Sequence, residues 1–94
     1  MATSTLNAKF DFGALITTPG ASEKLKHTDI LGGLFRHIEG DFGDISEGDK
    51  QLNEEAIKNG GCIHSEYHTA DGTKFWIITE ADRSCTTILL PEEY

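Results

Sequence analysis

Two histidines and a glutamate recur at every second position of one short stretch, as His64, Glu66 and His68. If this stretch is a β-strand, all three side chains project from the same face. Two imidazoles and a carboxylate are suitable ligands for zinc, iron or another transition metal. Successive members of the set would, however, lie about 6.6 Å apart along the strand, and no clear fourth ligand is present. A partly solvated polar edge strand is the favoured interpretation, and a metal site is the alternative.

A second group of reactive side chains is a run of seven acids within residues 39–55, opposed only by Lys50. Carboxylates on one helix and its leading loop can imitate the phosphate spacing that Lys- and Arg-lined nucleic-acid grooves hold. A solvated helix face without a binding role explains the same run. The acids are Glu39, Asp41, Asp44, Glu47, Asp49, Glu54 and Glu55.

Asp82 and Arg83 form a third candidate, with Glu80 close by, at the expected tip of a hairpin. Charged loop residues on a rigid support often contact a partner. The same residues are also typical of a local ion pair and an Asx-type turn. A second partner contact at Asp82 and Arg83 is therefore one of two interpretations.

Motifs for catalysis are missing from the sequence. No nucleophile signature surrounds Ser46, Ser65 or Ser84, and no histidine stands in a recognisable relation to a cysteine. Gly32-Gly33 is not a phosphate loop, because it lies within a helical pattern and lacks a following lysine. The sequence predicts a protein that is not an enzyme and uses no cofactor.

Length and charge limit the remaining classes. The 94 residues correspond to a single domain, 1–94, and we expect residues 1–7 to be disordered. Sixteen acidic against eight basic residues give a net charge of −8, which disfavours direct nucleic-acid binding and favours a basic protein partner. No apolar run approaches the roughly 18 residues of a membrane helix, and no secretory signal is recognisable. We expect a cytoplasmic protein without a membrane partner, and the sequence does not determine its oligomeric state.

The densest apolar and β-branched stretch, residues 73–90, is expected to organise the fold. Residues 75–79 and 85–90 are predicted strands. Apolar side chains occupy consecutive positions in both, so both faces of this hairpin are expected to be covered.

Another predicted strand, residues 62–69, leads into residues 74–79 through an Asp-Gly pair suited to a two-residue type I′ turn. This turn fixes the pairing of the two strands. It would place Ser65, Glu66 and Tyr67 opposite Ile78, Ile77 and Trp76 respectively, so that the face carrying His64, Glu66 and His68 would meet Phe75, Ile77 and Thr79.

Helices are predicted between the first strand and the hairpin. Residues 9–17 are predicted to form an edge strand or an extended segment over the sheet. Residues 21–26 are predicted to form one or two turns of helix, capped by Thr18 or Ser22. A longer helix should begin at Thr28 or Asp29 and end near Glu39, and another should span residues 47–59 behind the Ser46 cap. The apolar face expected for the longer helix consists of Ile30, Leu31, Leu34, Phe35 and Ile38.

This order of elements predicts an α+β fold. Its sheet is a three-stranded antiparallel meander, to which an N-terminal strand is added if residues 9–17 pair. Two or three short helices pack against it. Gly32 and Gly33 weaken the longer helix, unless their missing side chains let another element approach it closely.

Several segments resemble a family of small proteins, about a hundred residues long, that are encoded on bacterial plasmids, integrated elements and phages and commonly labelled plasmid-related. The resemblance covers residues 10–94 and brings no catalytic residues. It implies a mobile-element setting, in which accessory genes often encode small inhibitors of host defence. The segments are GDFGD at residues 40–44, DKQLNEEA at residues 49–56, and WIITEADRS with TTILLPEEY in the last third.

The leading hypothesis is therefore a small acidic accessory protein that binds a basic surface of a nucleic-acid-handling partner. The partner would be a host defence nuclease if the protein is an anti-CRISPR or anti-restriction inhibitor. The rival is a metal-binding module or metal-dependent enzyme using His64, Glu66 and His68. A third alternative is a self-assembling component that pairs through an exposed sheet edge.

Overall fold

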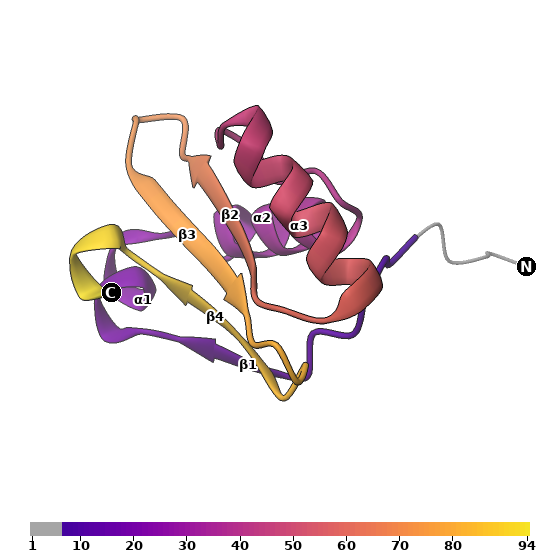
Figure 1. The fold of residues 1–94 in the computed structure, drawn as a ribbon. Coiled ribbons are helices and arrows are strands. Elements are labelled where there is room, and N and C mark those ends of the chain that lie inside the picture. The colour runs from indigo at the N-terminus through magenta and orange to yellow at the C-terminus, as the bar shows by residue number, and fades with distance from the viewer. Residues whose placement is uncertain (1–6) are drawn as a thin grey trace, which may run out of the picture.

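The fold is a four-stranded mixed sheet with helices packed on it, as seen in a computed structural model that describes residues 7–94 (Figure 1). The expectation of disorder in residues 1–7 falls, apart from Asn7, outside the described residues. The elements are β1 (Ala14–Thr17), α1 (Pro19–Lys24), α2 (His27–Ile38), α3 (Glu47–Asn59), β2 (Ile63–His68), β3 (Lys74–Thr79), β4 (Cys85–Leu89) and a 3-10 helix, η1 (Pro91–Glu93).

The strands lie in the order β1-β4-β3-β2. β2, β3 and β4 form the predicted antiparallel meander, and β1 is added at one edge, parallel to β4. This arrangement confirms the α+β fold class. None of the helices within residues 7–94 has the length and apolar character needed to span a bilayer.

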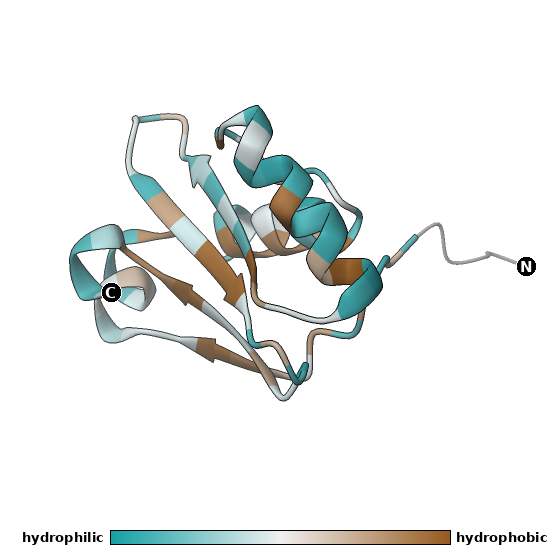
Figure 2. Ribbon diagram, in the orientation of Figure 1, coloured by the Kyte–Doolittle hydropathy of each residue, from teal (hydrophilic) through white to brown (hydrophobic). Residues whose placement is uncertain are grey.

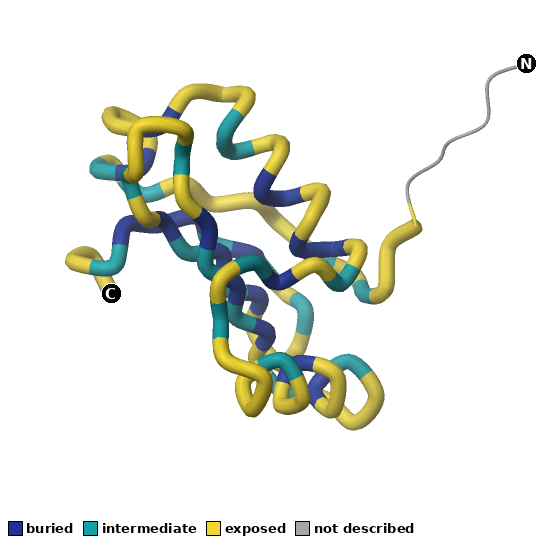
Figure 3. The backbone as a smooth tube through the Cα atoms, turned by 90° about the horizontal axis from the view of Figure 1, so that it is seen from above, coloured by how far each residue is buried: buried dark blue, intermediate teal, exposed yellow. Residues whose placement is uncertain are grey.

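One face of the sheet, called the inner face below, is buried beneath α1 and α2. Phe75, Ile77 and Ile88 on this face are at most 2% exposed and join residues of both helices in the main core. Figure 3 shows the buried stretches of the chain in the middle of the molecule and the exposed ones at its periphery. Gly33 of α2 lies directly on it, since a Cβ there would be 2.9 Å from the Phe75 ring. The close approach, one of the two alternatives for these glycines, is thus found at Gly33, while Gly32 faces open space.

The apolar face expected for α2 is only partly right. Leu34 and Ile38 are buried, but Leu31 and Phe35 are 49% and 48% exposed. The buried face includes His37 instead, which is completely enclosed. A polar side chain can occupy this position because both of its ring nitrogens have partners, as described below.

The opposite face, called the outer face, is not covered by a helix layer, so the expectation that both faces of the hairpin are covered is only partly right. On this face Leu89, opposite Trp76, is 5% exposed. Trp76, Ile78 and Thr87 on this face are half-buried. Burial alternates along β2 and β3 accordingly. Figure 2 shows hydrophobic segments along the strands and a mainly hydrophilic α3. In β3 the consecutive residues Ile77 and Ile78 supply one buried and one half-buried side chain, whereas Ile88, Leu89 and Leu90 at the end of β4 are all buried.

The pairing of β2 with β3 differs by one residue from the prediction. Ser65 lies opposite Ile77, Glu66 opposite Trp76, and Tyr67 opposite Phe75. The outer face of β3 beside His64, Glu66 and His68 therefore carries Ile78, Trp76 and Lys74, instead of the expected Phe75, Ile77 and Thr79.

The connecting loop explains this shift. Gly72 N–H donates to Thr69 O at 3.0 Å, so Ala70 and Asp71 are the central turn residues and Gly72, with φ +90°, is an extra residue. A type I′ turn would need positive φ at both of its central residues, and Arg83 is the only non-glycine with positive φ in residues 7–94. The loop is consequently one residue longer than assumed.

Helix and strand ends agree with the predictions in most places. α3 spans the expected residues, and the Ser46 hydroxyl accepts from Asp49 N at 3.1 Å. α1 is capped by Thr18 but begins at Pro19. α2 begins earlier than expected, because Asp29 accepts from Lys26 N at 3.2 Å and so lies in the first turn instead of at the cap. β1 is shorter than the predicted strand and begins at Ala14.

The free edge of β2 is covered by two segments. The Asn53 amide of α3 donates to His64 O at 2.8 Å and accepts from His64 N at 3.1 Å. Farther along, Glu66 N donates to Phe42 O and Asp44 N donates to Glu66 O. Gly43, with φ +76°, permits this approach, since a Cβ there would lie 2.0 Å from Glu66 O. These bonds hold α3 and the loop before it against β2.

Candidate binding groove beside strand β2

A groove lies between the N-terminal half of α3, the loop before it and the outer face of β2 and β3. Its volume is about 400 Å³. The groove exists because Asn53 and the loop attach α3 to the edge of β2 and leave the outer face uncovered. Its lining residues are Asp44, Ile45, Ser46, Asp49, Leu52, Asn53, Cys62, His64, Glu66 and Trp76.

Three carboxylates line this groove, those of Asp44, Asp49 and Glu66, and no lysine or arginine lines it within residues 7–94. The first two belong to the predicted acidic run, whereas the sequence indicates Glu66 only as a candidate metal ligand. Asp44 Oδ2 lies 2.8 Å from His68 Nδ1. Asp49 has no ion-pair partner in the described part of the chain. The groove is thus an anionic hollow.

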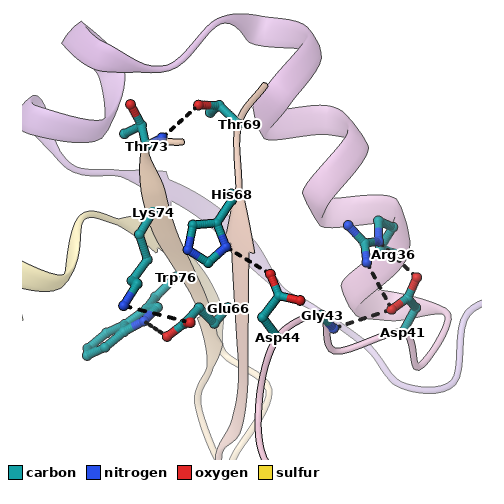
Figure 4. Close-up of polar contacts among 10 residues, drawn as sticks. All are labelled: Arg36, Asp41, Gly43, Asp44, Glu66, His68, Thr69, Thr73, Lys74 and Trp76. Atoms are coloured by element: carbon teal, nitrogen blue, oxygen red, sulfur yellow. Dashed lines mark hydrogen bonds and ion pairs between the residues drawn. The ribbon is translucent and has the colours of Figure 1, made fainter. Parts of the chain in front are cut away.

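Trp76 forms the aromatic wall of the groove. Its Nε1–H donates to Glu66 Oε1 at 3.0 Å, while Lys74 Nζ lies 3.9 Å from Glu66 Oε2 (Figure 4). The rings of His64 and Tyr94 contact the Trp76 indole at centroid distances of 4.6 and 5.7 Å. An indole held at its nitrogen and by two neighbouring rings is fixed in orientation, and so is the carboxylate bonded to it.

His64 contributes no positive charge to the groove at neutral pH. Burial lowers the pKa of His64, and the carboxylates of Glu66 and Asp49 act in the opposite direction without reversing the shift. The imidazole is therefore neutral near pH 7. The negative charge of the groove is preserved there.

The predicted acidic run is divided by its own ion pairs. Asp41 accepts from Arg36 Nε at 2.8 Å and from Arg36 Nη2 at 3.2 Å (Figure 4), and this hydrogen bonding holds the pKa of Asp41 below its usual value. Glu47 lies 3.4 Å from Lys50 Nζ. These carboxylates are partly neutralised within the molecule.

The helix also separates the rest of the run. At 3.6 residues per turn, Asp49 projects roughly 120–160° away from Glu47, Glu54 and Glu55 around α3. Glu54 and Glu39 line a different hollow, together with Lys9 and Lys58. The run is therefore not one continuous acidic face, and Asp44 and Asp49 are the members that meet in the groove.

Asp82 and Arg83 lie in the turn between β3 and β4. Asp82 Oδ1 accepts from Ser84 N at 2.9 Å, an Asx turn, and the bonds to Ser84 lower the pKa of Asp82. Arg83 donates to Gly61 O at 2.7 Å and to Ala56 O at 2.8 Å, so its guanidinium caps the C-terminal end of α3. Partner binding by these two residues stays a prediction, and Arg83 already has a structural role.

His64, Glu66 and His68 share the outer face but turn to different partners. His64 contacts Trp76, Glu66 accepts from Trp76, and His68 pairs with Asp44. Within the described residues no group of three His, Cys, Asp or Glu side chains is arranged to hold a metal ion. The metal-binding alternative gains no support from this geometry.

A serine and a histidine do meet on the inner face. His37 Nδ1 lies 2.6 Å from Ser65 Oγ, and His37 Nε2 lies 2.9 Å from Thr79 Oγ1. Thr86 extends this chain to Phe12 O. Burial lowers the pKa of His37 to about 3. All four side chains are completely buried, so the chain of bonds has a structural role.

The sequence alone did not identify Trp76 and Glu66 as parts of one site. The alternation of side chains between the two faces of β2 and β3 would have placed Trp76 beside Glu66, but only in the observed register.

Comparison of the chain with protein-family models, with curated proteins and with solved structures gives no match. The geometry of the groove is therefore the main indication of function.

Proposed function

We propose that this protein is a non-enzymatic binding protein that docks on a basic surface of a nucleic-acid-handling partner. The observation that carries the proposal is the groove beside β2, which combines three carboxylates with no lysine or arginine among its described lining residues. Charge of this sign attracts Lys- and Arg-rich surfaces and repels nucleic acid. The net charge of −8 adds to this attraction at a distance.

A nucleic-acid-handling partner is proposed because such proteins concentrate Lys and Arg in grooves that hold phosphates. An acidic protein placed on such a groove would exclude the nucleic acid and act as an inhibitor. The resemblance to plasmid-related proteins supports a host defence nuclease as the partner class. On this proposal, the partner is recognised by its charge and aromatic contacts, and no catalytic step occurs.

The test is affinity capture from a bacterial host lysate with two variants of equal charge. One variant neutralises the groove through Asp44→Asn, Asp49→Asn and Glu66→Gln. The control neutralises three acids on other sides of α3 through Glu47→Gln, Glu54→Gln and Glu55→Gln. We expect a nucleic-acid-binding protein that the wild type and the control retain, that the groove variant loses, and that added duplex DNA displaces.

Salt provides the second measurement. Binding that depends on charge should weaken strongly between about 0.15 and 0.5 M salt, where the Debye length falls from about 8 to about 4 Å. A captured protein that stays bound in high salt, or that the groove variant retains as well as the control, would contradict the proposed function.

The second candidate, self-association through a sheet edge, is favoured by β1. All four residues of this edge strand are exposed, with Leu15 and Ile16 at 48% and 46%, and none is charged. Ala14 N and Thr18 N donate to β4 carbonyls or their neighbours, so the backbone groups of Leu15 and Thr17 point away from the sheet. Natural sheets usually protect such edges with charges or proline.

Two antiparallel copies of β1 would place Ile16 opposite Ile16 of the second copy. Light scattering should then show a dimer for the wild type and monomers for Ile16→Lys and Ile16→Asp, while an equimolar mixture of the two variants should dimerise again. A wild type that is monomeric at high concentration would exclude this candidate.

A further inference from the structure

The groove has the shape and chemistry of a receptor for one cationic side chain. It is about 400 Å³ in volume, which exceeds the space that a single long side chain requires, and it is open to solvent beside α3. Leu52, at its rim, is 65% exposed and offers an apolar surface to the methylene stem of such a side chain.

The charges of the groove select a cation over an anion or a neutral group. Asp49 has no ion-pair partner within residues 7–94, while Asp44 lies within hydrogen-bond distance of the His68 ring and Glu66 has an ion-pair partner in Lys74. The Lys74 contact is long, at 3.9 Å. An entering cation would thus meet one free carboxylate and two that already make contacts within the molecule.

The aromatic wall distinguishes between the two common cations of proteins. Trp76 is held by its hydrogen bond to Glu66 and by ring contacts with His64 and Tyr94, so a flat π-surface and a carboxylate are fixed side by side. A planar guanidinium stacks on an aromatic ring while it donates paired hydrogen bonds to a carboxylate. The lysine ammonium is compact and strongly hydrated and cannot make both contacts in this way.

From these contacts we infer that the groove binds the side chain of an arginine presented by the basic partner, with the guanidinium against Trp76 and in hydrogen-bond contact with the carboxylates of Glu66 and Asp49. This inference rests on the proposed function, which it deepens by naming the side chain that is recognised. Arginine content, beyond total charge, then determines which basic surfaces bind.

The experiment compares two peptides of equal length and charge, one with arginines separated by glycines and one with lysines in the same positions. The chain contains a single tryptophan, so fluorescence of Trp76 reports directly on the groove. We expect the arginine peptide to bind roughly fivefold to tenfold more tightly than the lysine peptide at low salt, and to change the Trp76 emission.

Three variants locate the binding. Glu66→Gln keeps an oxygen that can accept from the Trp76 indole but removes the charge, and Asp49→Asn removes the free carboxylate. Each should weaken binding of the arginine peptide about fivefold or more, whereas Glu55→Gln, with the same charge change elsewhere on α3, should alter it less than about twofold.

The outcomes separate the inference from the proposed function. Equal affinities for the two peptides, both reduced by Glu66→Gln and Asp49→Asn, would overturn the inference and leave the proposed function standing. An arginine preference that survives both groove variants would overturn the assignment of the arginine to this groove. If neither peptide binds at low salt, the proposed function fails together with the inference.

Discussion

The polar side chains on the two faces of β2 lie in different environments. On the inner face, Ser65 bonds to His37, which also bonds to Thr79, and no buried side-chain polar atom of the described residues lacks a partner. On the outer face, His64 and Glu66 are half-buried and border an open groove. Residues that are neighbours in sequence thus belong to a closed network and to an open surface.

This difference indicates which face of the sheet can bind a partner. A closed polar network stabilises one fold, because substitution of any of its side chains leaves a buried polar group without a hydrogen-bond partner. The open face retains charge that its own molecule does not neutralise, and a second molecule can use it. Substitutions on the inner face should therefore lower stability, and substitutions on the outer face should mainly lower binding.

The largest expected effect is acid destabilisation through His37. Its pKa is about 3 in the folded protein and 6.5 in a free side chain, so below pH 6.5 the unfolded chain binds a proton that the folded protein does not. The contribution of neutral His37 to the free energy of unfolding should therefore be fully present above pH 6.5. It should decrease as the pH falls towards 3, by roughly 4–5 kcal/mol in total.

The measurement is urea unfolding between pH 7 and pH 5, where few carboxylates titrate, with His37→Gln as the control. His64, whose pKa is lowered too, acts in the same direction in both proteins. The wild type should lose more stability over this range than the variant. Parallel curves for the two proteins would show that His37 is not held neutral.

The next effect compares two adjacent isoleucines of β3. Ile77 is completely buried on the inner face, and Ile78 is half-buried on the outer face. We expect Ile77→Ala to lower the free energy of unfolding by about 2–5 kcal/mol, and Ile78→Ala by about 1 kcal/mol or less. Chemical denaturation measures both. Equal losses would mean that the outer face is covered in solution.

The smallest effect concerns two threonines of the same sheet. The Thr79 hydroxyl contacts His37 Nε2 and Thr86 Oγ1, while Thr87 is on the outer face. Thr79→Val should cost about 1–3 kcal/mol, because the buried His37 nitrogen loses its partner, and Thr87→Val should change stability by less than about 0.5 kcal/mol. Thermal unfolding of the pair tests this, and a neutral Thr79→Val would contradict the role given to the network.

Local signals in the sequence were sufficient for most elements. Ser46 and the glycines after α3 define that helix, and the β-branched residues define β3 and β4. The pairing of β2 with β3 was predicted, but its register was wrong by one residue, because an Asp-Gly pair fits both a two-residue turn and the longer loop observed. In the observed register Trp76 lies beside Glu66, whereas the predicted register places it opposite Tyr67, so the groove could not be predicted.

Two other features depend on contacts between distant segments. His37 is buried because Ser65 and Thr79, 28 and 42 positions away, supply partners for its ring nitrogens, which no periodicity in α2 reveals. Likewise, the acidic run looked continuous in sequence, but helix geometry and the Arg36 ion pair divide it. Only Asp44 and Asp49 of that run lie in the groove.

The most direct test of the groove as the binding surface is an NMR titration of ¹⁵N-labelled protein with the arginine peptide. We expect the shifts to concentrate in Asp44, Asp49, His64 and Glu66 and in the indole N–H of Trp76, with little change in Glu54, Glu55 or β1. Shifts centred on the far side of α3 or on β1, with the Trp76 indole signal unmoved, would contradict this expectation.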